Sequence, residues 1–230
     1  MKIEIQNLTV TYEEQGEMFA ALEDVTFGVG EGEFVSVIGS SGCGKSTLLN
    51  VLEGLCRPSG GHVLIDGAPV MGPGIDRGVV FQQYSLFPWM TARQNVAFGV
   101  KQAKKDLNRA GILKIADEYL QKVGLEDAGR RYPSRLSGGM QQRVAIARAL
   151  AMDTDILLMD EPFGAVDAKN RVLLQELLLR LWDGEAKRKT VVFITHDIDE
   201  AIFLSDRIIM LTEGPGRVYK DLRVPFPRSE

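Results

Sequence analysis

A glycine-rich stretch near residue 40 has the residue types that bind phosphate. The segment GSSGCGKST, residues 39–47, fits the spacing G-x-x-x-x-G-K-[ST]. It follows an apolar run and opens a helical segment, which is the context that this motif requires. Gly42 and Gly44 allow the backbone to wrap a phosphate chain with its N–H groups turned inward. The stretch therefore predicts a site for a nucleoside triphosphate.

Three polar residues at the end of this loop complete the chemistry. Lys45 supplies a positive charge to the β- and γ-phosphates, Ser46 offers a hydroxyl to Mg2+, and Thr47 can donate to the α-phosphate. We expect the whole loop to contact the nucleotide: Gly39, Ser40, Ser41, Gly42, Cys43, Gly44, Lys45, Ser46 and Thr47. Because Cys43 lies next to Lys45 and a helix N-terminus, which lower a thiol's pKa, we also expect it to be a reactive thiol.

A pair of carboxylates ends a later apolar run. The segment ILLMDE, residues 156–161, is four apolar residues followed by Asp160 and Glu161. Ligands of α/β sheets bind at the carboxyl ends of strands, so Asp160 is placed to hold Mg2+ and Glu161 to accept a proton from an attacking water. The alternative is two solvated carboxylates that cap the next helix. Beside a phosphate loop, the pair favours hydrolysis of the nucleotide.

A second glycine-containing loop carries no lysine. In LSGGMQQR, residues 136–143, Ser137 and the glycines Gly138 and Gly139 precede a helical stretch. Free backbone N–H groups at such a helix start point toward an anion. The alternative is a simple helix cap formed by Ser137, and the two roles use the same geometry, so they do not exclude each other.

In this order, with a histidine ending the next strand, the segments resemble those of the ATP-binding-cassette (ABC) ATPases over essentially the whole chain. The loop 136–143 separates that family from other P-loop proteins. The resemblance implies ATP hydrolysis with ATP and Mg2+ as ligands. It also implies that Ser137, Gly138 and Gly139 bind the γ-phosphate of ATP held by a second copy of the chain, so that ATP binding produces a homodimer.

The resemblance assigns four further residues. Gln82 matches the glutamine that senses Mg2+ and the γ-phosphate, His196 matches a histidine that contacts the γ-phosphate, and Asp167 matches an aspartate at the dimer interface. Tyr12 matches an aromatic residue that stacks on adenine, although a core tyrosine is the rival interpretation. Met140 and the segment GAVD, 164–167, depart from the commoner family residues. The catalytic set is then Lys45, Gln82, Glu161 and His196, and the Mg2+ set is Ser46, Gln82 and Asp160.

The hydrophobic pattern separates two kinds of strand. An alternating run at 1–12, a second strand candidate at 21–29 and a short hairpin with an Asp-Gly turn at 62–70 indicate a small antiparallel sheet. Nearly continuous apolar runs indicate a parallel sheet covered on both faces. The continuous runs are 33–39, 78–82, 155–161, 190–196 and 207–211, and helices are expected at about 45–55, 168–183 and 197–204. The long stretch at roughly 91–151 is mostly helical and too long for one crossover, so we interpret it as an inserted subdomain.

With the resemblance, this pattern predicts an α/β fold, a P-loop NTPase (RecA-like) core with a mostly parallel sheet. The core would carry an N-terminal antiparallel β subdomain, at about 1–32 and 61–71, and an inserted α-helical subdomain at about 88–153. All 230 residues would form one ABC ATPase domain.

Composition restricts the location and the partners. A net charge of −4 and a pI near 5.4 argue against a general nucleic-acid binder. We expect neither a signal peptide nor a transmembrane segment, because no apolar run approaches the roughly 18 residues that span a bilayer. By resemblance to separate ATPase subunits of bacterial-type importers, we expect a peripheral protein on the cytoplasmic face of the inner (plasma) membrane.

A cluster of apolar residues follows Gln82 and marks an interface. Residues Leu86, Phe87, Pro88, Trp89 and Met90 lie where the family receives a transmembrane permease subunit, and a substrate-binding protein would act through that permease. The alternative is packing within the helical subdomain. The phrases LFPWMTARQNV, YPSRLSGGM and EGPGRV resemble the nitrate/sulfonate/taurine import group. A soluble ABC ATPase acting on a non-transport partner and a P-loop kinase are the alternative functions.

Overall fold

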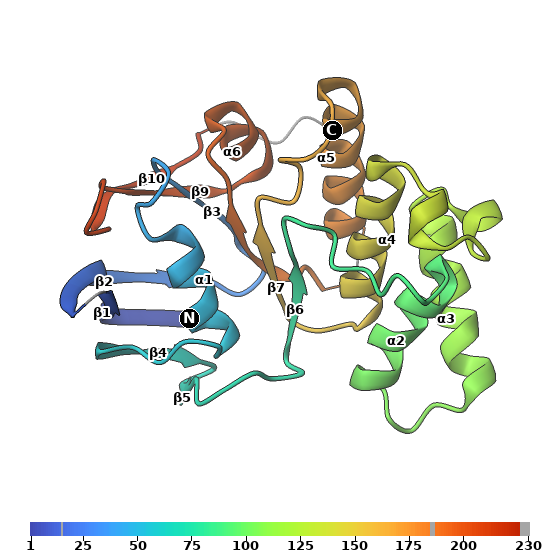
Figure 1. Cartoon of the computed structure of the whole chain (residues 1–230), viewed down its shortest axis with the longest axis horizontal. Coiled ribbons are helices and arrows are strands. Elements are labelled where there is room, and N and C mark those ends of the chain that lie inside the picture. The colour runs from blue at the N-terminus through green and yellow to red at the C-terminus, as the bar shows by residue number, and fades with distance from the viewer. Residues whose placement is uncertain (15, 185–186, 226–230) are drawn as a thin grey trace. The chain divides into compact units, whose positions relative to one another are not determined.

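The computed structural model describes residues 1–14, 16–184 and 187–225. The chain divides into two compact units, a first unit of Met1–Gly74 with Arg188–Glu230 and a second unit of Ile75–Lys187. Figure 1 labels most of their helices and strands. The α/β class with mostly parallel strands, an antiparallel N-terminal sheet and an inserted helical stretch is confirmed. The subdomain boundaries given above stay a prediction.

The first unit begins with an antiparallel sheet in the strand order β2-β1-β4-β5. Its strands are β1 (Ile3–Glu14), β2 (Glu17–Val29), β4 (Gly60–Ile65) and β5 (Ala68–Pro69). The predicted hairpin at 62–70 is confirmed: Asp66 and Gly67 both have positive φ, 51° and 76°, as a two-residue turn between twisted strands requires.

The first unit also holds strands β3 (Phe34–Ile38), β8 (Thr190–Ile194), β9 (Arg207–Leu211) and β10 (Val218–Arg223), in the order β10-β9-β3-β8. β3 is parallel to both neighbours, and every residue of β3 and β8 is buried. Two helices belong to this unit, α1 (Lys45–Glu53) and α6 (Ile198–Leu204). Ile38, Ala201 and Ile208 form a buried cluster that joins β3, α6 and β9.

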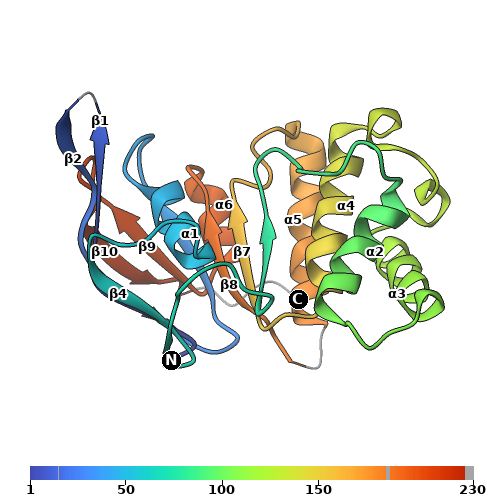
Figure 2. The same cartoon turned by 60° about the horizontal axis from the view of Figure 1, so that its bottom comes forward.

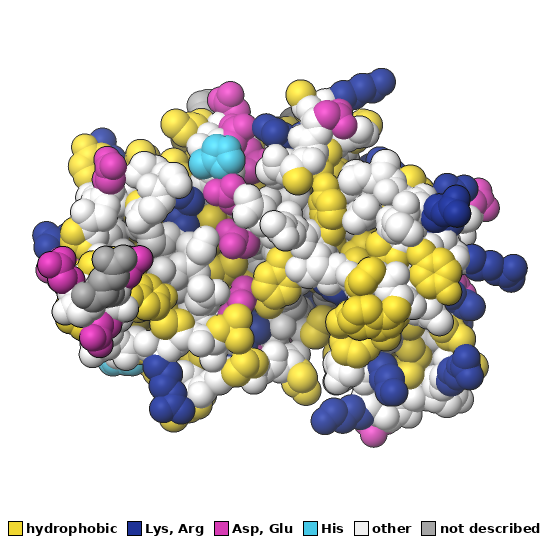
Figure 3. Space-filling model, viewed as in Figure 1, with side chains coloured by type: hydrophobic (Ala, Val, Ile, Leu, Met, Phe, Trp, Pro, Cys, Tyr) yellow, Lys and Arg dark blue, Asp and Glu magenta, His cyan; other side chains and the backbone are white. Residues whose placement is uncertain are grey.

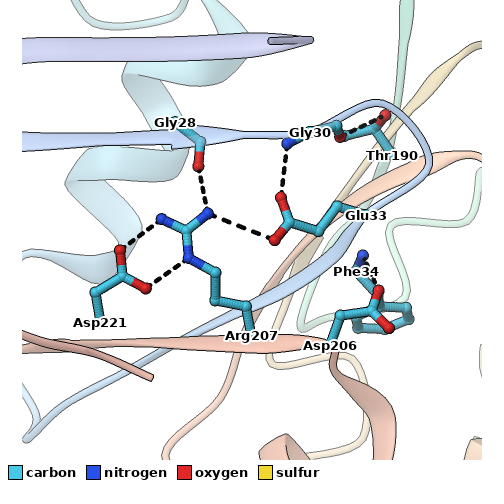
Figure 4. Close-up of polar contacts among 8 residues, drawn as sticks. All are labelled: Gly28, Gly30, Glu33, Phe34, Thr190, Asp206, Arg207 and Asp221. Atoms are coloured by element: carbon cyan, nitrogen blue, oxygen red, sulfur yellow. Dashed lines mark hydrogen bonds and ion pairs between the residues drawn. The ribbon is translucent and has the colours of Figure 1, made fainter. Parts of the chain in front are cut away.

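Strand β10 is absent from the prediction, and Arg207 on β9 explains how it is held. The Arg207 guanidinium makes a two-pronged ion pair with Asp221 on β10, donates to the Gly28 carbonyl on β2 at 2.9 Å, and contacts Glu33 at 3.4 Å (Figure 4). These contacts, the Asp221 hydrogen bond first, raise the pKa of Arg207, and Arg207 lowers the pKa of Asp221. Asp206 accepts from the Phe34 N–H at 2.8 Å and so fixes the start of β3 beside this network.

The second unit packs helices beside two parallel strands, β6 (Arg77–Val80) and β7 (Ile156–Asp160). The helices are α2 (Ala92–Ala103), α3 (Arg109–Lys122), α4 (Gly138–Ala151) and α5 (Ala168–Asp183), with short 3-10 turns η1 (Glu126–Ala128) and η2 (Pro133–Arg135). Within this unit α4 contacts α2, α3, α5 and β6, and Figure 2 shows α5, α4, α2 and α3 lying side by side. Helix α4 is therefore the central helix of the unit.

Side-chain caps set where these helices begin. Thr91 forms a capping box with Gln94 at the start of α2, and Asn108 caps α3. Ser137 caps α4, Asp167 caps α5, and Asp197 caps α6. Such a side chain satisfies one of the backbone N–H groups that a helix start leaves without a partner. Within the described part of the chain, no helix has both the length and the apolar character to cross a bilayer.

Candidate nucleotide-binding site

The predicted phosphate loop joins β3 to α1 in the first unit. β3 ends at Ile38 and α1 begins at Lys45, so residues 39–44 form the turn between them. Gly42 and Gly44 have φ of 80° and 92°, the left-handed region that their residue type was predicted to supply. The strand–loop–helix context of the motif is therefore confirmed, and contact of this loop with nucleotide stays a prediction.

The Lys45 ammonium is bound by backbone carbonyls of its own loop. Its Nζ donates to the carbonyls of Gly39 and Ser40, at 2.8 and 2.9 Å, and lies 3.8 Å from the Cys43 sulfur. Only 7% of Lys45 is exposed. The positive charge is thus held at the centre of the loop, where an anionic phosphate chain would be stabilised by it.

The expectation that Cys43 is a reactive thiol is wrong for this conformation. Its side chain is fully buried, and a Cβ placed on Gly39 would lie 2.5 Å from the sulfur, so the thiol points back into the loop. A thiol must be partly exposed as well as ionised to react. Cys56, which follows α1, is the more exposed cysteine.

Tyr12 lies on β1 of the same unit and is partly exposed. Its hydroxyl is 3.7 Å from the Cys56 sulfur and lies near Thr47 of the phosphate loop, and burial raises the pKa of Tyr12. Its ring lies 5.6 Å from that of Phe19, the residue directly opposite in the β1–β2 register. Tyr12 therefore stands beside the predicted phosphate loop rather than deep in the core, in agreement with a role at the base of a nucleotide.

His196 comes two residues after the end of β8. β3 and β8 run parallel with Val37 opposite Ile194, so His196 and the phosphate loop both follow the carboxyl ends of neighbouring strands. The His196 side chain is exposed. The carboxyl edge of a parallel sheet is where ligands bind in α/β proteins.

The second unit brings Gln82 and Glu161 together. Gln82 follows β6 and Glu161 follows β7, two adjacent parallel strands, and the Gln82 amide donates to the Glu161 carboxylate at 3.3 Å. Glu161 has φ of 39°, a strained value for a residue with a side chain. Such strain at a strand end is consistent with a carboxylate held in place for chemistry. Asp160, the last residue of β7, is partly exposed beside it.

The loop of Ser137 lies in the same unit, at the start of α4. Ser137 Oγ accepts from the Met140 N–H at 3.3 Å, so the predicted cap is present. Asp167 caps α5 in the same way, accepting from the Asn170 N–H at 3.1 Å, and the Asn170 side chain lowers the pKa of Asp167. Asn170 also lies against Gly139, 3.8 Å from the position of an added Cβ. The two capped helix starts are therefore neighbours.

Two residues that sequence reasoning missed join these loops, Asn170 and Tyr84. Asn170 stands three residues after Asp167, which is the spacing of an N-cap contact and was available as a signal. Tyr84 gives no such signal, because its contacts are with Gly138 and Ala165, both far away along the chain.

The residues suit Mg2+ bound together with a nucleotide. Across the ranges that the structure describes, no group of three or more His, Cys, Asp or Glu side chains could hold a metal ion by itself. Mg2+ is usually bound by one or two carboxylates together with substrate phosphates. A hydroxyl such as that of Ser46 and a carboxylate such as that of Asp160 are therefore enough protein ligands.

Comparison with known proteins agrees with this geometry. A family model described as "ABC transporter" matches residues 22–164, more than half of the chain. An uncharacterised ABC transporter ATP-binding protein of Methanocaldococcus jannaschii is 49% identical over 99% of this chain and 84% of its own length. The nitrate import ATP-binding protein NrtD of Synechococcus elongatus is 52% identical over 91% of this chain and 76% of its own length. The bicarbonate transport ATP-binding protein CmpC of the same species is 50% identical over 93% of this chain, but over only 32% of its own length.

Solved structures agree as well. A dimeric structure of a bacterial ABC transporter cassette has a TM-score of 0.86 at 38% identity, covering 98% of this chain and 100% of the other. A dimeric ATP-binding cassette in a post-hydrolysis state, bound to ADP and Pi, has a TM-score of 0.84 at 36% identity with the same coverage. The chain therefore belongs to the ABC transporter family, as an ATP-binding subunit whose enzymatic activity is ATP hydrolysis.

Proposed function

We propose that the chain powers an importer for nitrate-, sulfonate- or taurine-like substrates by closing as an ATP-bound homodimer against a membrane permease. The observation that carries the catalytic part is the contact between Gln82 and Glu161 at the ends of adjacent strands. It places a carboxylate and an amide where a water attacking a γ-phosphate could be oriented. The nitrate part of this substrate class is supported by the relative that is named for nitrate import and is 52% identical to this chain. The sulfonate and taurine part rests on the phrases LFPWMTARQNV, YPSRLSGGM and EGPGRV.

Each predicted residue then has one task. Tyr12 stacks on the adenine, and the loop 39–47 holds the phosphates with Lys45 neutralising their charge. Ser46, Gln82 and Asp160 would hold Mg2+, which would supply Lewis-acid polarisation of the phosphate. The remaining residues act on the γ-phosphate and its water: Glu161 as general base, Gln82 as the sensor that orients it, and His196 as a hydrogen-bonding partner.

A second copy of the chain completes each site. Ser137, Gly138 and Gly139 lie at the start of α4, and Asp167 lies at the start of the neighbouring helix α5. In a two-fold dimer these helix starts bind the partner's γ-phosphate, and ATP favours the closed dimer by its differential affinity for it. Hydrolysis removes that phosphate and allows the dimer to reopen.

Two variants test this proposal by sedimentation with Mg-ATP. Glu161→Gln should bind Mg-ATP, hydrolyse it roughly 10^2–10^4-fold more slowly, and accumulate as a dimer. Ser137→Arg should bind ATP through its own phosphate loop but neither dimerise nor turn over. A Glu161→Gln protein that stays monomeric, or a Ser137→Arg protein that dimerises with ATP, contradicts the model.

The permease would dock on the loop 86–90 of the second unit. Trp89 is 69% exposed. Phe87 packs edge-to-face against Phe98 of α2, with ring centroids 4.8 Å apart. The Phe87 and Trp89 rings are 5.5 Å apart. Figure 3 shows hydrophobic side chains gathered over the region of this loop and α2. Intramolecular packing therefore accounts for Phe87 and leaves Trp89 presented outward.

Helix α4 also contacts this loop and the residue before it. Arg148 donates to the Ser85 carbonyl at 2.8 Å, and its guanidinium lies 5.9 Å from the centre of the Phe87 ring. Burial lowers the pKa of Arg148. A docking loop held by two helices is preorganised, which lowers the entropic cost of binding a partner.

Trp89→Ala tests the docking surface. The variant should keep the nucleotide affinity and thermal stability of the isolated subunit but lose roughly 30-fold or more in affinity for the permease, as expected for an aromatic anchor carrying about 2 kcal/mol. Tyr132→Ala, which truncates another exposed aromatic of the second unit, is the matched control. The subunit would then lie at the cytoplasmic face of the membrane and reach a substrate-binding protein only through the permease.

A further inference from the structure

We propose that Tyr84 is a positioning residue that holds the Gln82 segment, the loop after Glu161 and the start of α4 in one register. Tyr84 lies two residues after Gln82 and is partly buried. Its hydroxyl donates to the Ala165 carbonyl at 3.5 Å, and the same oxygen lies 2.7 Å from where a Cβ on Gly138 would be. One hydroxyl therefore touches two loops that come from different parts of the sequence.

The Ala165 side of this contact is a rigid turn. The Gly164 N–H donates to the Glu161 carbonyl at 3.1 Å, and the Val166 N–H donates to the Phe163 carbonyl at 3.1 Å. Phe163 and Val166 are both buried. Tyr84 thus binds the turn between Glu161 and Asp167 at a point where that turn is anchored on both sides.

The contact between Tyr84 and Gly138 gives a reason for glycine at position 138 that helix propensity does not. Glycine is a weaker helix former than alanine, by about 1 kcal/mol in a helix interior, and α4 opens with two glycines. At Gly139 an added Cβ would meet only Asn170, at an ordinary 3.8 Å. At Gly138 it would meet the Tyr84 hydroxyl at 2.7 Å, closer than real Cβ contacts come. Within this chain, the absent side chain at Gly138 is the space that Tyr84 occupies.

The consequence for function rests on the dimer proposed above. Gln82 and Glu161 would act on ATP held by their own chain, whereas the Ser137 loop would act on the partner's ATP. Tyr84 links the two sets inside one unit, so removing its hydroxyl should loosen their relative placement. The affinity of the phosphate loop for ATP should not change, because Tyr84 is absent from it.

A double-mutant cycle tests the contact itself. Gly138→Ala should lower the melting temperature of the chain, and adding Tyr84→Phe should restore much of the loss, since the next ring atom, Cζ, lies 3.6 Å from the added Cβ. Gly139→Ala is the matched control, and Tyr84→Phe should give it no such rescue. Equal effects of Tyr84→Phe in both backgrounds overturn the contact.

Kinetics test the positioning role. Because the hydroxyl contact is long, Tyr84→Phe should lower kcat for ATP by about two- to fivefold and leave KM unchanged. Unchanged kcat, or a rise in KM with kcat unaffected, overturns the role. Glu161→Gln serves as a parallel control for the proposed function. If Glu161→Gln dimerises with Mg-ATP while Tyr84→Phe hydrolyses ATP at the wild-type rate, the positioning role of Tyr84 is refuted and the proposed function stands. If it fails to dimerise, the proposed function has failed independently of Tyr84.

Discussion

Asn95 on α2 offers a sharp test of how the docking loop is held. Its side chain is fully buried, and its Oδ1 accepts from the Phe87 N–H at 2.8 Å. Its Nδ2 lies within 3.0–3.2 Å of three carbonyls, those of Phe87, Met90 and Thr91. One asparagine therefore binds the whole turn between residues 87 and 91.

The cost of its removal can be estimated from these contacts. An amide nitrogen has two hydrogens, so at most two of the three carbonyls are bonded at full strength, and the Phe87 N–H makes a third bond. At about 1 kcal/mol net for each bond, Asn95→Ala should cost about 3 kcal/mol. For a chain of this size the melting temperature should fall by roughly 6–12 °C.

Asn95→Asp refines the test, because aspartate keeps the side-chain shape and the acceptor oxygen of asparagine but lacks its N–H donors. A carboxylate there would face carbonyl oxygens in a buried site, and burial would raise its pKa. The folded variant would thus bind a proton more tightly than the unfolded chain. We expect it to be less stable than Asn95→Ala at pH 7 and to gain stability relative to wild type as the pH falls.

Thermal unfolding followed by circular dichroism measures both variants. Asn108→Ala is the control, since Asn108 is an exposed cap with a single bond to the Gly111 N–H at 2.9 Å, typically worth about 1 kcal/mol. The reasoning is refuted if Asn95→Ala is no more destabilising than Asn108→Ala, or if Asn95→Asp tracks wild type at every pH.

Two further predictions concern the first unit. Arg207 lowers the pKa of Asp221, so that carboxylate stabilises the fold fully above its unfolded pKa and loses the effect as the pH falls through its lowered folded value. Asp221→Asn should therefore be less stable than wild type at pH 7 and converge with it in acid, measured by urea unfolding at both pH values; a constant difference would contradict the ion pair's role. A maleimide should label Cys56 in folded Cys43→Ser protein but label Cys43 in Cys56→Ser protein only in denaturant, as mass spectrometry can check. Rapid labelling of native Cys43 would show that the loop opens.

The sequence predicted best those features whose physics is local. The phosphate loop, its strand and its helix are recognisable because glycine spacing, an apolar run and a lysine lie within fifteen or so residues of one another. The continuous apolar runs likewise predicted β3, β6, β7, β8 and β9, because strands buried on both faces have no polar alternation.

What the sequence could not predict depends on contacts between distant segments. β10 is mostly exposed, so its sequence VYKDLR shows no regular pattern of apolar residues. It is held by the ion pair between Asp221 and Arg207 on β9, fourteen residues earlier in the chain. The burial of Cys43 depends on how the loop folds over its sulfur, which neighbouring residue types do not reveal. The close approach of the Tyr84 hydroxyl to Gly138 joins segments far apart in the sequence, and only the folded unit brings the two together.

Tyr12 permits a final test, of whether a ring or a hydroxyl matters beside the phosphate loop. Its hydroxyl lies near Thr47 and Cys56, and the residue is partly exposed. If the ring stacks on adenine, Tyr12→Phe should bind ATP nearly as wild type. Tyr12→Leu should lose stacking worth about 0.5–1.5 kcal/mol, a roughly 2–12-fold weaker affinity.

Titration calorimetry of the isolated chain with ATP and with inorganic triphosphate separates the two roles. Triphosphate has no base, so its affinity should be the same in wild type and Tyr12→Leu. Equal losses of ATP affinity in Tyr12→Phe and Tyr12→Leu would assign the effect to the lost hydroxyl and refute stacking. The partly exposed ring opposite Phe19 favours the other outcome, because an exposed aromatic face beside the predicted phosphate loop offers a stacking surface to a base.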